Sequence, residues 1–274
     1  MASNHLDEML DFAISAAQEA GRVTLEFFRS DLAVRTKGDR SPVTMADLKA
    51  EEKLRELISS RYPDHDITGE EYGETSKSSQ YRWILDPIDG TQSFIRGVGM
   101  YGVLIGLELG GQPVLGVANF PALGELVYAA RGLGCYWNGR RIRASEIADI
   151  SEATLLMTDV PALYEYGRGQ AYRQLSGLVR LERTWGDCYG HILVATGRAE
   201  IMLDPVMNVW DCAPLLPILQ EAGGTFTDWN GVATIRGGNA LSTNGRLFDR
   251  VKEIILESTN AGPGSEPDAP QGSA

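Results

Sequence analysis

The stretch DPIDGT places two aspartates, a turn and a threonine directly after an apolar run. Asp86 and Asp89 have a proline between them, so both carboxylates and the carbonyl of Ile88 can point at one place. Such oxygen atoms are the ligands that Mg2+ prefers, and the ion leaves positions for water and substrate phosphate. Gly90 and Thr91 would then open a helix through QSFIRG, whose free N–H groups favour a phosphate. The stretch is either a metal and phosphate site or, as isolated Asp-Gly turns more often are, a solvated turn.

Other catalytic motifs fit this sequence less well. The DxDGT signature of haloacid-dehalogenase-type phosphatases has one residue between its acids, whereas two residues separate Asp86 and Asp89, so nucleophile and general acid would be out of register. The glycine-rich stretch at 132–139 lies among predicted strands with no following helix, which argues against a dinucleotide loop. No serine-hydrolase elbow or His-Glu-x-x-His pattern is present. His191 falls on a predicted helix and is interpreted as a packed or surface residue, not a metal ligand.

The net charge of the chain is −12 at neutral pH, which argues against nucleic acid or an anionic membrane surface as a partner. An anionic substrate would therefore need a local positive element, such as bound metal. The three cysteines have neither disulfide-framework nor zinc-site spacing, which indicates a reducing compartment. Because no leader-like or membrane-spanning run is found, we expect a cytoplasmic protein.

Two amphipathic helices are predicted first, over residues 5–29 and 45–59, because apolar residues recur at three- and four-residue spacing. Asp47 lies in or near the first turn of the second helix. The run YRWILD is too apolar for a strand with one wet face, so a buried strand should end at Asp86. YGVLIGLEL and PVLGVANF flank a hairpin signal at 110–112, and ELVYAAR and CYWNGRRIR add strands. The first half therefore reads as helices followed by a largely antiparallel sheet.

In the second half, strands and helices alternate, which is typical of an α/β unit. Strands are predicted at TLLMT, LERTW, EIMLD and GTFTDW, with helices in the segment up to Arg180, at CYGHILVATG and after Trp210. Pro217 should kink the last helix or mark its late start. The end of the chain is rich in Gly, Pro and Ser and is expected to be disordered. The predicted parts are 1–148, with the antiparallel sheet; 149–257, an α/β lobe; and 258–274, the tail.

Five stretches, in order, resemble the inositol monophosphatase family of metal-dependent phosphatases: TMADLKAE, GEE, WILDPIDGT, GDCYGHILVATGRAEIMLDP and NVWDCAPLLPILQEAGG. The resemblance covers about residues 5 to 257. It implies an α/β (α+β) fold of five layers, αβαβα, that is often a homodimer. It also implies hydrolysis of a small phosphate monoester with two or three Mg2+ ions per site, by metal-activated water and without a phosphoenzyme.

Roles follow for the residues at matching positions. The resemblance implies metal ligation by Glu70, Asp86, the carbonyl of Ile88, Asp89 and Asp211. Asp47 and Thr91 match the pair that activates water, with Thr91 orienting it and Asp47 accepting from the threonine hydroxyl; Glu70 joins them as a catalytic residue. The amides of Gly90 and Thr91 match the phosphate cradle. Carboxylates converging in one cleft would raise one another's pKa unless cations neutralise them.

The stretch GDCYG, with SFIRGV and LDPVMNVWD, looks most like the histidinol-phosphatase branch of the family. Asp187 replaces the small uncharged residue typical of inositol-type members, and Asp204 falls where the family contacts the leaving alcohol. Two acids there suit a cationic amine and an imidazole, whose free pKa is about 6.5. Asp187 could instead, or in addition, cap the following helix, and Asn208 is a further pocket candidate. The expected substrate-binding residues are Asp89, Gly90, Thr91, Gly186, Asp187, Cys188, Asp204 and Asp211.

The expected reaction is hydrolysis of L-histidinol phosphate, as in histidine biosynthesis. Inositol-1-phosphate or another sugar phosphate is the nearest alternative substrate. From a different class, the chain could be a catalytically inactive metal-binding protein on the same fold, but all metal and water-activating positions are intact. The stretch GVGMYG departs from the family pattern, which has proline where Gly99 stands, and this leaves the geometry of that loop open.

Overall fold

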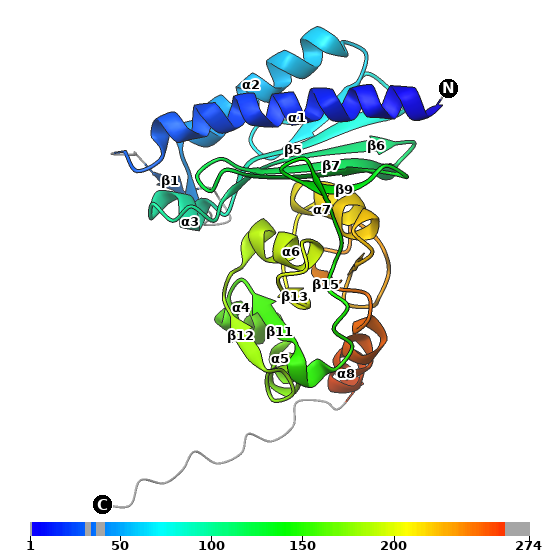
Figure 1. Ribbon diagram of the computed structural model, residues 1–274. Helices are drawn as coiled ribbons and strands as arrows, with labels where there is room; N and C mark the ends of the chain where they lie inside the picture. Colours follow the sequence, from blue (N-terminus) through cyan, green and yellow to red (C-terminus); the bar gives the residue numbers. More distant parts are fainter. Residues whose placement is uncertain (1, 31–33, 37–41, 261–274) are drawn as a thin grey trace, which may run out of the picture.

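The computed structural model describes residues 2–30, 34–36 and 42–260, which form stacked layers of helix and sheet (Figure 1). α1 (Ala2–Phe27) and α2 (Met45–Arg61) make up the first layer and lie over one face of a large sheet. Apolar residues on one side of each helix join side chains of the sheet in a continuous buried core. The first two helices predicted from periodicity are therefore present.

The large sheet has eight strands in the order β10-β9-β8-β7-β6-β5-β3-β4, and it is antiparallel except where β3 runs parallel to β5. The central strand β5 is covered on both faces, with Trp83 and Leu85 against the first helical layer and Ile84 against the layer on the other side. The strands are β3 (Asp66–Gly69), β4 (Gly73–Thr75), β5 (Tyr81–Asp89), β6 (Gly102–Leu109), β7 (Gln112–Phe120), β8 (Glu125–Ala130), β9 (Gly134–Trp137) and β10 (Arg140–Ile142).

A middle layer is formed by α6 (Asp187–Ala195) and α7 (Val209–Glu221), between the large sheet and a smaller one (Figure 1). α7 approaches the large sheet closely because Gly106 and Gly116, which pair across β6 and β7, leave room for its backbone. A methyl group added at Gly116 would lie 2.0 Å from the carbonyl oxygen of Pro214. This contact seats α7 directly on the sheet.

The smaller sheet has five strands in the order β12-β11-β13-β15-β14. β12, β11 and β13 are parallel, so their carboxyl ends meet at one edge, whereas β15 is antiparallel to both neighbours. The last layer, α4, α5 and α8, covers the far face. The bounds are β11 (Thr154–Met157), α4 (Val160–Glu165), α5 (Gly169–Ser176), β12 (Leu181–Arg183), β13 (Ile201–Asp204), β14 (Thr225–Thr227), β15 (Ala240–Thr243) and α8 (Phe248–Asn260). The short elements are β1 (Arg35–Thr36), β2 (Pro42–Val43), α3 (Thr91–Ile95) and a 3-10 turn (Ile150–Glu152).

Helix, sheet, helix, sheet and helix thus follow one another, which confirms the expected αβαβα layering. Among the described residues, none of the helices combines the length and apolar character needed to cross a bilayer. The division of the chain near residue 148 stays a prediction.

Several predicted boundaries are wrong. The buried strand does not end at Asp86 but continues to Asp89, because a shift in register keeps it paired with β6. A late helix start at Pro217 is also wrong, since α7 passes through both Pro214 and Pro217. Burial between the two sheets offsets the backbone hydrogen bonds that these prolines remove. β15 and α8 have no counterpart among the predicted elements.

The predicted disordered tail starts too early. Ser258 belongs to α8 and is buried, with its hydroxyl donating to the carbonyl of Ile254 at 2.6 Å and lying 2.8 Å from the amide oxygen of Gln174. A helix residue with these contacts is part of the fold. The remainder of the predicted tail, residues 261–274, lies outside the described residues.

Candidate active site

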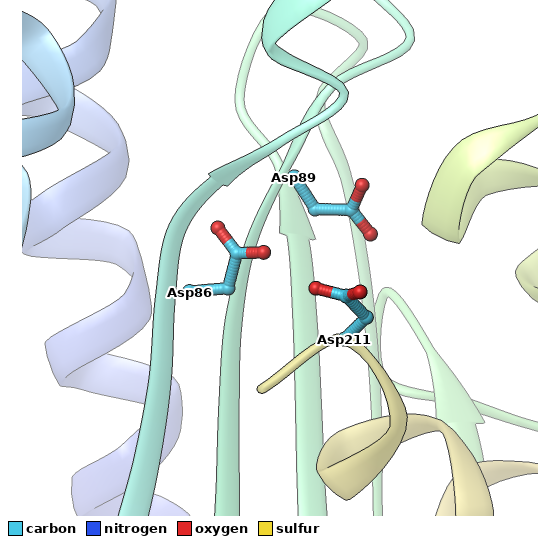
Figure 2. Close-up of side chains that lie close together, drawn as sticks. All are labelled: Asp86, Asp89 and Asp211. Carbon is cyan, nitrogen blue, oxygen red and sulfur yellow. The ribbon is translucent and has the colours of Figure 1, made fainter. Parts of the chain in front are cut away.

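Three aspartates from two elements converge at the end of β5. Asp86 and Asp89 come from β5 itself, and Asp211 comes from the first turn of α7 (Figure 2). One carboxylate oxygen from each lies within 4.8 Å of the others. Carboxylate oxygens gathered in this way are suited to a hard divalent cation. The close seating of α7 on the sheet is what brings the third acid to the other two.

The DPIDGT turn is fixed by its own short hydrogen bonds. Asp86 Oδ1 accepts from the N–H of Ile88 at 3.0 Å, and Thr91 Oγ1 donates to the carbonyl of Ile88 at 3.0 Å. Gly90 has a φ of 84°, a left-handed conformation that glycine adopts without strain, and it is the N-cap of α3. The carboxylates, the Ile88 carbonyl and the start of α3 therefore lie within one rigid turn.

Two of the acids occupy equivalent places in different helices. Asp47 and Asp211 are each the third residue of their helix, and each accepts from the N–H of its N-cap residue, Thr44 at 2.8 Å and Asn208 at 2.7 Å. Negative charge is stabilised in the first turn of a helix by the partial positive charge of the free N–H groups. This arrangement holds the buried carboxylate of Asp47 and the half-buried one of Asp211 in fixed positions.

Glu70 enters the site from the turn that follows β3. Its N–H donates to the carbonyl of Leu85 at 3.2 Å, which ties the turn to β5. The charge of Glu70 contributes to raising the pKa of Asp47, after burial, and that of Asp86. Glu70 therefore belongs electrostatically to the same cluster as the acids of β5 and α2.

The residues at the start of α6 border the cluster of aspartates. The backbone N–H of Cys188 donates to Asp89 Oδ2 at 3.1 Å, although the Cys188 side chain is buried. A methyl group added at Gly90 would lie 3.1 Å from Asp187 Oδ2, so this carboxylate borders the DPIDGT turn. Asp204, the last residue of β13, contributes to raising the pKa of Asp187. The expected substrate-side acids thus stand next to the expected metal ligands.

The acids of the site are difficult to ionise together. Burial, then the charges of neighbouring carboxylates, raises the pKa of Asp86 and of Asp89 well above the ordinary value. The pKa of Asp187 is raised to about 7 by burial and by Asp204, and that of Asp211 is raised to about 7, chiefly by burial. Divalent cations would remove this penalty. The donor set therefore fits hard metal ions.

Comparison with known proteins agrees with this geometry. Residues 5–260 match the pattern described as the inositol monophosphatase family. The chain belongs to the inositol monophosphatase family. The resemblance predicted from DPIDGT and the downstream WD motif is confirmed.

Individual members of the family are similar over nearly the whole chain. A histidinol-phosphatase of Chlorobaculum parvum is 47% identical over 242 residues, which are 88% of this chain and 93% of that protein. A histidinol-phosphatase of Mycobacterium tuberculosis is 36% identical over 265 residues, 94% of this chain and 100% of that protein. Among solved structures, the IMPase of Thermotoga maritima matches with a TM-score of 0.84 and 30% identity, covering 93% of this chain and 99% of that one.

Some expected details of this inositol monophosphatase family site are absent from the structure. Thr91 does not donate to Asp47: its hydroxyl bonds to Ile88, while Asp47 Oδ2 accepts from the N–H and, at 2.6 Å, the hydroxyl of Thr44. The capping role considered for Asp187 is wrong, because Gly186 is the N-cap of α6 and no side chain caps it. The alternative that the carboxylate borders the site is the one that the geometry supports.

The polar residues that hold the site residues in place were not predicted from the sequence. Thr44 could have been found, since T-x-x-D before an apolar run is a helix-start pattern, and N-x-x-D at 208–211 is similar. Glu51 and Thr158 carry no local signal. Their partners, the turn after Glu70 and the acid Asp204, lie far away in sequence. His191 is buried, as the packed alternative predicted.

Proposed function

We propose that the protein is a metal-dependent phosphate monoester hydrolase that converts L-histidinol phosphate and water to L-histidinol and phosphate. The observation that carries the proposal is the position of Asp187, whose carboxylate borders the DPIDGT turn and has its pKa raised by burial and by the charge of Asp204. The two similar histidinol-phosphatases support the same substrate.

The residues that would hold the cations are the three converging aspartates with Glu70 and the carbonyl of Ile88. We propose two or three Mg2+ ions, since every donor is a hard oxygen atom. The ions would supply Lewis-acid activation of water and neutralise charge on the phosphate. The ligands are Glu70, Asp86, Ile88, Asp89 and Asp211.

The chain itself orients the reacting groups. The N–H groups of Gly90 and Thr91, at the start of α3, are proposed to hold the phosphate oxygens. Thr91 is proposed to orient the attacking water by accepting a hydrogen bond from it, and Asp47 is proposed to accept the proton that the water loses. Both hydrogen bonds from Thr44 go to Oδ2 of Asp47. One carboxylate oxygen is thus left for this role.

The alcohol half of the substrate would meet acids. Asp187 and Asp204 suit the ammonium group and the imidazole of histidinol, because a charge-assisted hydrogen bond is about twice as strong as a neutral one. Gly186 and Cys188 would line the same side through their backbone. A neutral polyol can also bond to carboxylates but gains less from two of them.

The test is Mg2+-dependent phosphate release from histidinol phosphate, inositol-1-phosphate and several sugar phosphates. We expect the highest kcat/KM for histidinol phosphate. A higher kcat/KM for inositol-1-phosphate or a sugar phosphate would contradict the proposed substrate, while the proposed phosphatase activity would stand. No release from any ester would favour a catalytically inactive protein, and trapping a phosphorylated residue from radiolabelled substrate would refute direct attack by water.

The biological setting is part of the same proposal. We propose a homodimer that acts in the cytoplasm in histidine biosynthesis. Sedimentation velocity of the full chain tests the dimer, since a single species with the mass of one chain would contradict it. Rescue of histidine-requiring bacteria that lack histidinol-phosphatase tests the pathway.

A further inference from the structure

The substrate-side acids lie at one edge of the smaller sheet. β12, β11 and β13 are parallel, and Asp204 ends β13 while Asp187 follows β12 at the start of α6. Thr158 directly follows β11, the strand between them. Ligands of open parallel sheets bind beyond the carboxyl ends of the strands. Thr158 is therefore placed between the two acids by the strand order.

The hydroxyl of Thr158 connects the two acids. Its Oγ1 accepts from the backbone N–H of Asp187 at 2.8 Å and donates to Asp204 Oδ2 at 2.8 Å. The direction of both bonds is fixed, because an amide can only donate and the hydroxyl has one proton to give. One side chain thus sets the position of one acid's backbone and the other acid's carboxylate.

The bond to Asp204 selects which oxygen remains for a ligand. Oδ2 accepts from Thr158 and lies 3.8 Å from Nε2 of His191, a fully buried ring whose Nδ1 is 2.7 Å from the hydroxyl of Ser242. Within the described part of the chain, Oδ1 of Asp204 takes part in no hydrogen bond. Oδ1 is therefore the oxygen that a ligand group would meet.

The bond to Asp187 supports an unusual backbone conformation. Asp187 has a φ of 51°, in the left-handed region that residues other than glycine rarely adopt. Gly186, the residue before Asp187, packs on Thr158, since a methyl group added at Gly186 would lie 2.2 Å from the Cα of Thr158. Thr158 therefore holds the turn that brings the Asp187 carboxylate to Gly90.

We infer that Thr158 is a positioning residue for substrate specificity: it holds Asp187 and Asp204 so that both carboxylates bind the cationic groups of the alcohol half. This inference rests on the proposed function. The hydrogen bonds of the Thr158 hydroxyl go to Asp187 and Asp204 and not to the expected phosphate cradle, so it acts on binding of the alcohol and not on the chemical step.

The experiment compares Thr158→Val, which keeps the shape but removes the hydroxyl, with Thr158→Ser, which keeps the hydroxyl. Steady-state kinetics are measured with histidinol phosphate and with inositol-1-phosphate at saturating Mg2+. For Thr158→Val we expect KM for histidinol phosphate to rise about tenfold with kcat within about threefold, and the values for inositol-1-phosphate to stay within about threefold. Thr158→Ser should stay within about twofold of the wild type on both esters.

Thr154→Val, the same change at the other end of β11, is the matched control, and thermal unfolding of every variant reports folding. Equal losses on both esters, or a Thr158→Ser enzyme as impaired as Thr158→Val, would show that Thr158 is only structural. Unchanged selectivity in Thr158→Val, with a wild type active on histidinol phosphate, overturns this inference alone. A wild type inactive on histidinol phosphate overturns the proposed function and this inference with it.

Discussion

Asp187 combines a left-handed backbone with a carboxylate at the edge of the DPIDGT turn. Its φ is 51°, and its pKa is raised to about 7 by burial and by Asp204. Asparagine is among the few other residues that tolerate this region of backbone space. Asp187→Asn therefore removes the charge while keeping the conformation, which makes it an informative substitution.

We expect Asp187→Asn to lower kcat/KM for histidinol phosphate by roughly 10- to 100-fold, because a hydrogen bond to a charged group contributes about 1.5–3 kcal/mol. The value for inositol-1-phosphate should stay within about threefold. Steady-state kinetics on both esters check this. Asp159→Asn, an exposed acid at the same sheet edge, controls for the loss of one charge. A similar loss on both esters would mean that Asp187 serves only the fold.

Residue roles were predictable where they belong to a local pattern. Asp86, Ile88 and Asp89 lie within one turn, so their spacing alone indicates a shared target. The hydrogen bond of Thr91 was not predictable in this way, since its hydroxyl has a near acceptor in Ile88 and a distant one in Asp47. The near acceptor is the one bonded in the structure.

At the scale of elements, the turn that carries Glu70 is held by α2. Glu51 is fully buried and accepts from the N–H of Glu71 at 2.7 Å, from the N–H of Tyr72 at 3.2 Å and from Arg55 Nε at 2.7 Å. Arg55 in turn donates to the carbonyl of Gly73. A buried carboxylate with these donors clamps the turn against the helix.

We expect Glu51→Gln to raise the Mg2+ concentration for half-maximal activity about tenfold or more, because glutamine cannot accept all three bonds and the Glu70 turn loosens. KM for substrate at saturating Mg2+ should change less. Activity titrated with Mg2+ measures both. Glu56→Gln is the control, since that side chain is 68% exposed and, among the described residues, forms an ion pair with Lys53. A lower melting temperature with an unchanged Mg2+ requirement would contradict the clamp.

The seating of α7 makes a second element-scale prediction. Gly116→Ala would place a methyl group 2.0 Å from the carbonyl oxygen of Pro214, and backbone at that site cannot move aside alone. Overpacking of this kind costs about 1–3 kcal/mol, and the displaced helix carries Asp211 with it. We expect a lower melting temperature and a kcat reduced about tenfold or more.

Thermal unfolding and Mg2+-dependent kinetics test Gly116→Ala. Gly177→Ala is the matched control, because its added methyl group would lie 3.6 Å from the nearest atom, an ordinary contact, in right-handed helical backbone. Full activity in Gly116→Ala would show that α7 shifts without moving Asp211.

Elements with strong periodicity or a distinctive turn were predicted correctly, as α1, α2 and the β6–β7 hairpin show. The helix after Trp210 was predicted and is present as α7, but the late start that Pro217 left open is wrong, because burial between two sheets, which one sequence does not show, makes the prolines acceptable. The end of the chain was misjudged for a similar reason. Ser258 reads as part of a polar tail, yet it packs against Gln174 of α5.

For the whole molecule, the layers and the cluster of acids were predicted mainly from the family resemblance, because no local rule shows that Asp211 reaches Asp86 across more than a hundred residues. Physical chemistry explains why the acids are buried together. The chain has a net charge of −12 and gathers several of its carboxylates at one site, where their mutual repulsion destabilises the fold unless cations neutralise them. Metal binding and folding stability are therefore linked.

This linkage predicts how the metal-free protein responds to pH. A carboxyl group whose pKa is higher in the folded than in the unfolded state binds more protons when folded. The free energy of unfolding therefore falls as the pH rises from the unfolded-state pKa of 3.8 through the folded-state pKa. The folded-state pKa is about 7 for Asp187 and for Asp211. One such group lowers the free energy of unfolding by about 2–3 kcal/mol between pH 5 and 8. Thermal unfolding in a chelator should therefore give a lower melting temperature at pH 8 than at pH 5.

Asp211→Asn separates this effect from the titration of all other groups. The amide oxygen can still accept from the N–H of Asn208, so the helix start is kept while one buried charge is lost. We expect the variant without metal to melt at a higher temperature than the wild type at pH 8, and at a similar temperature at pH 5. Mg2+ should raise the melting temperature of the wild type at pH 8 far more than that of the variant. Equal rises in melting temperature with Mg2+ would mean that Asp211 is not a ligand. If the melting temperature of the wild type in chelator were the same at pH 5 and pH 8, ionisation of these acids would not destabilise the fold.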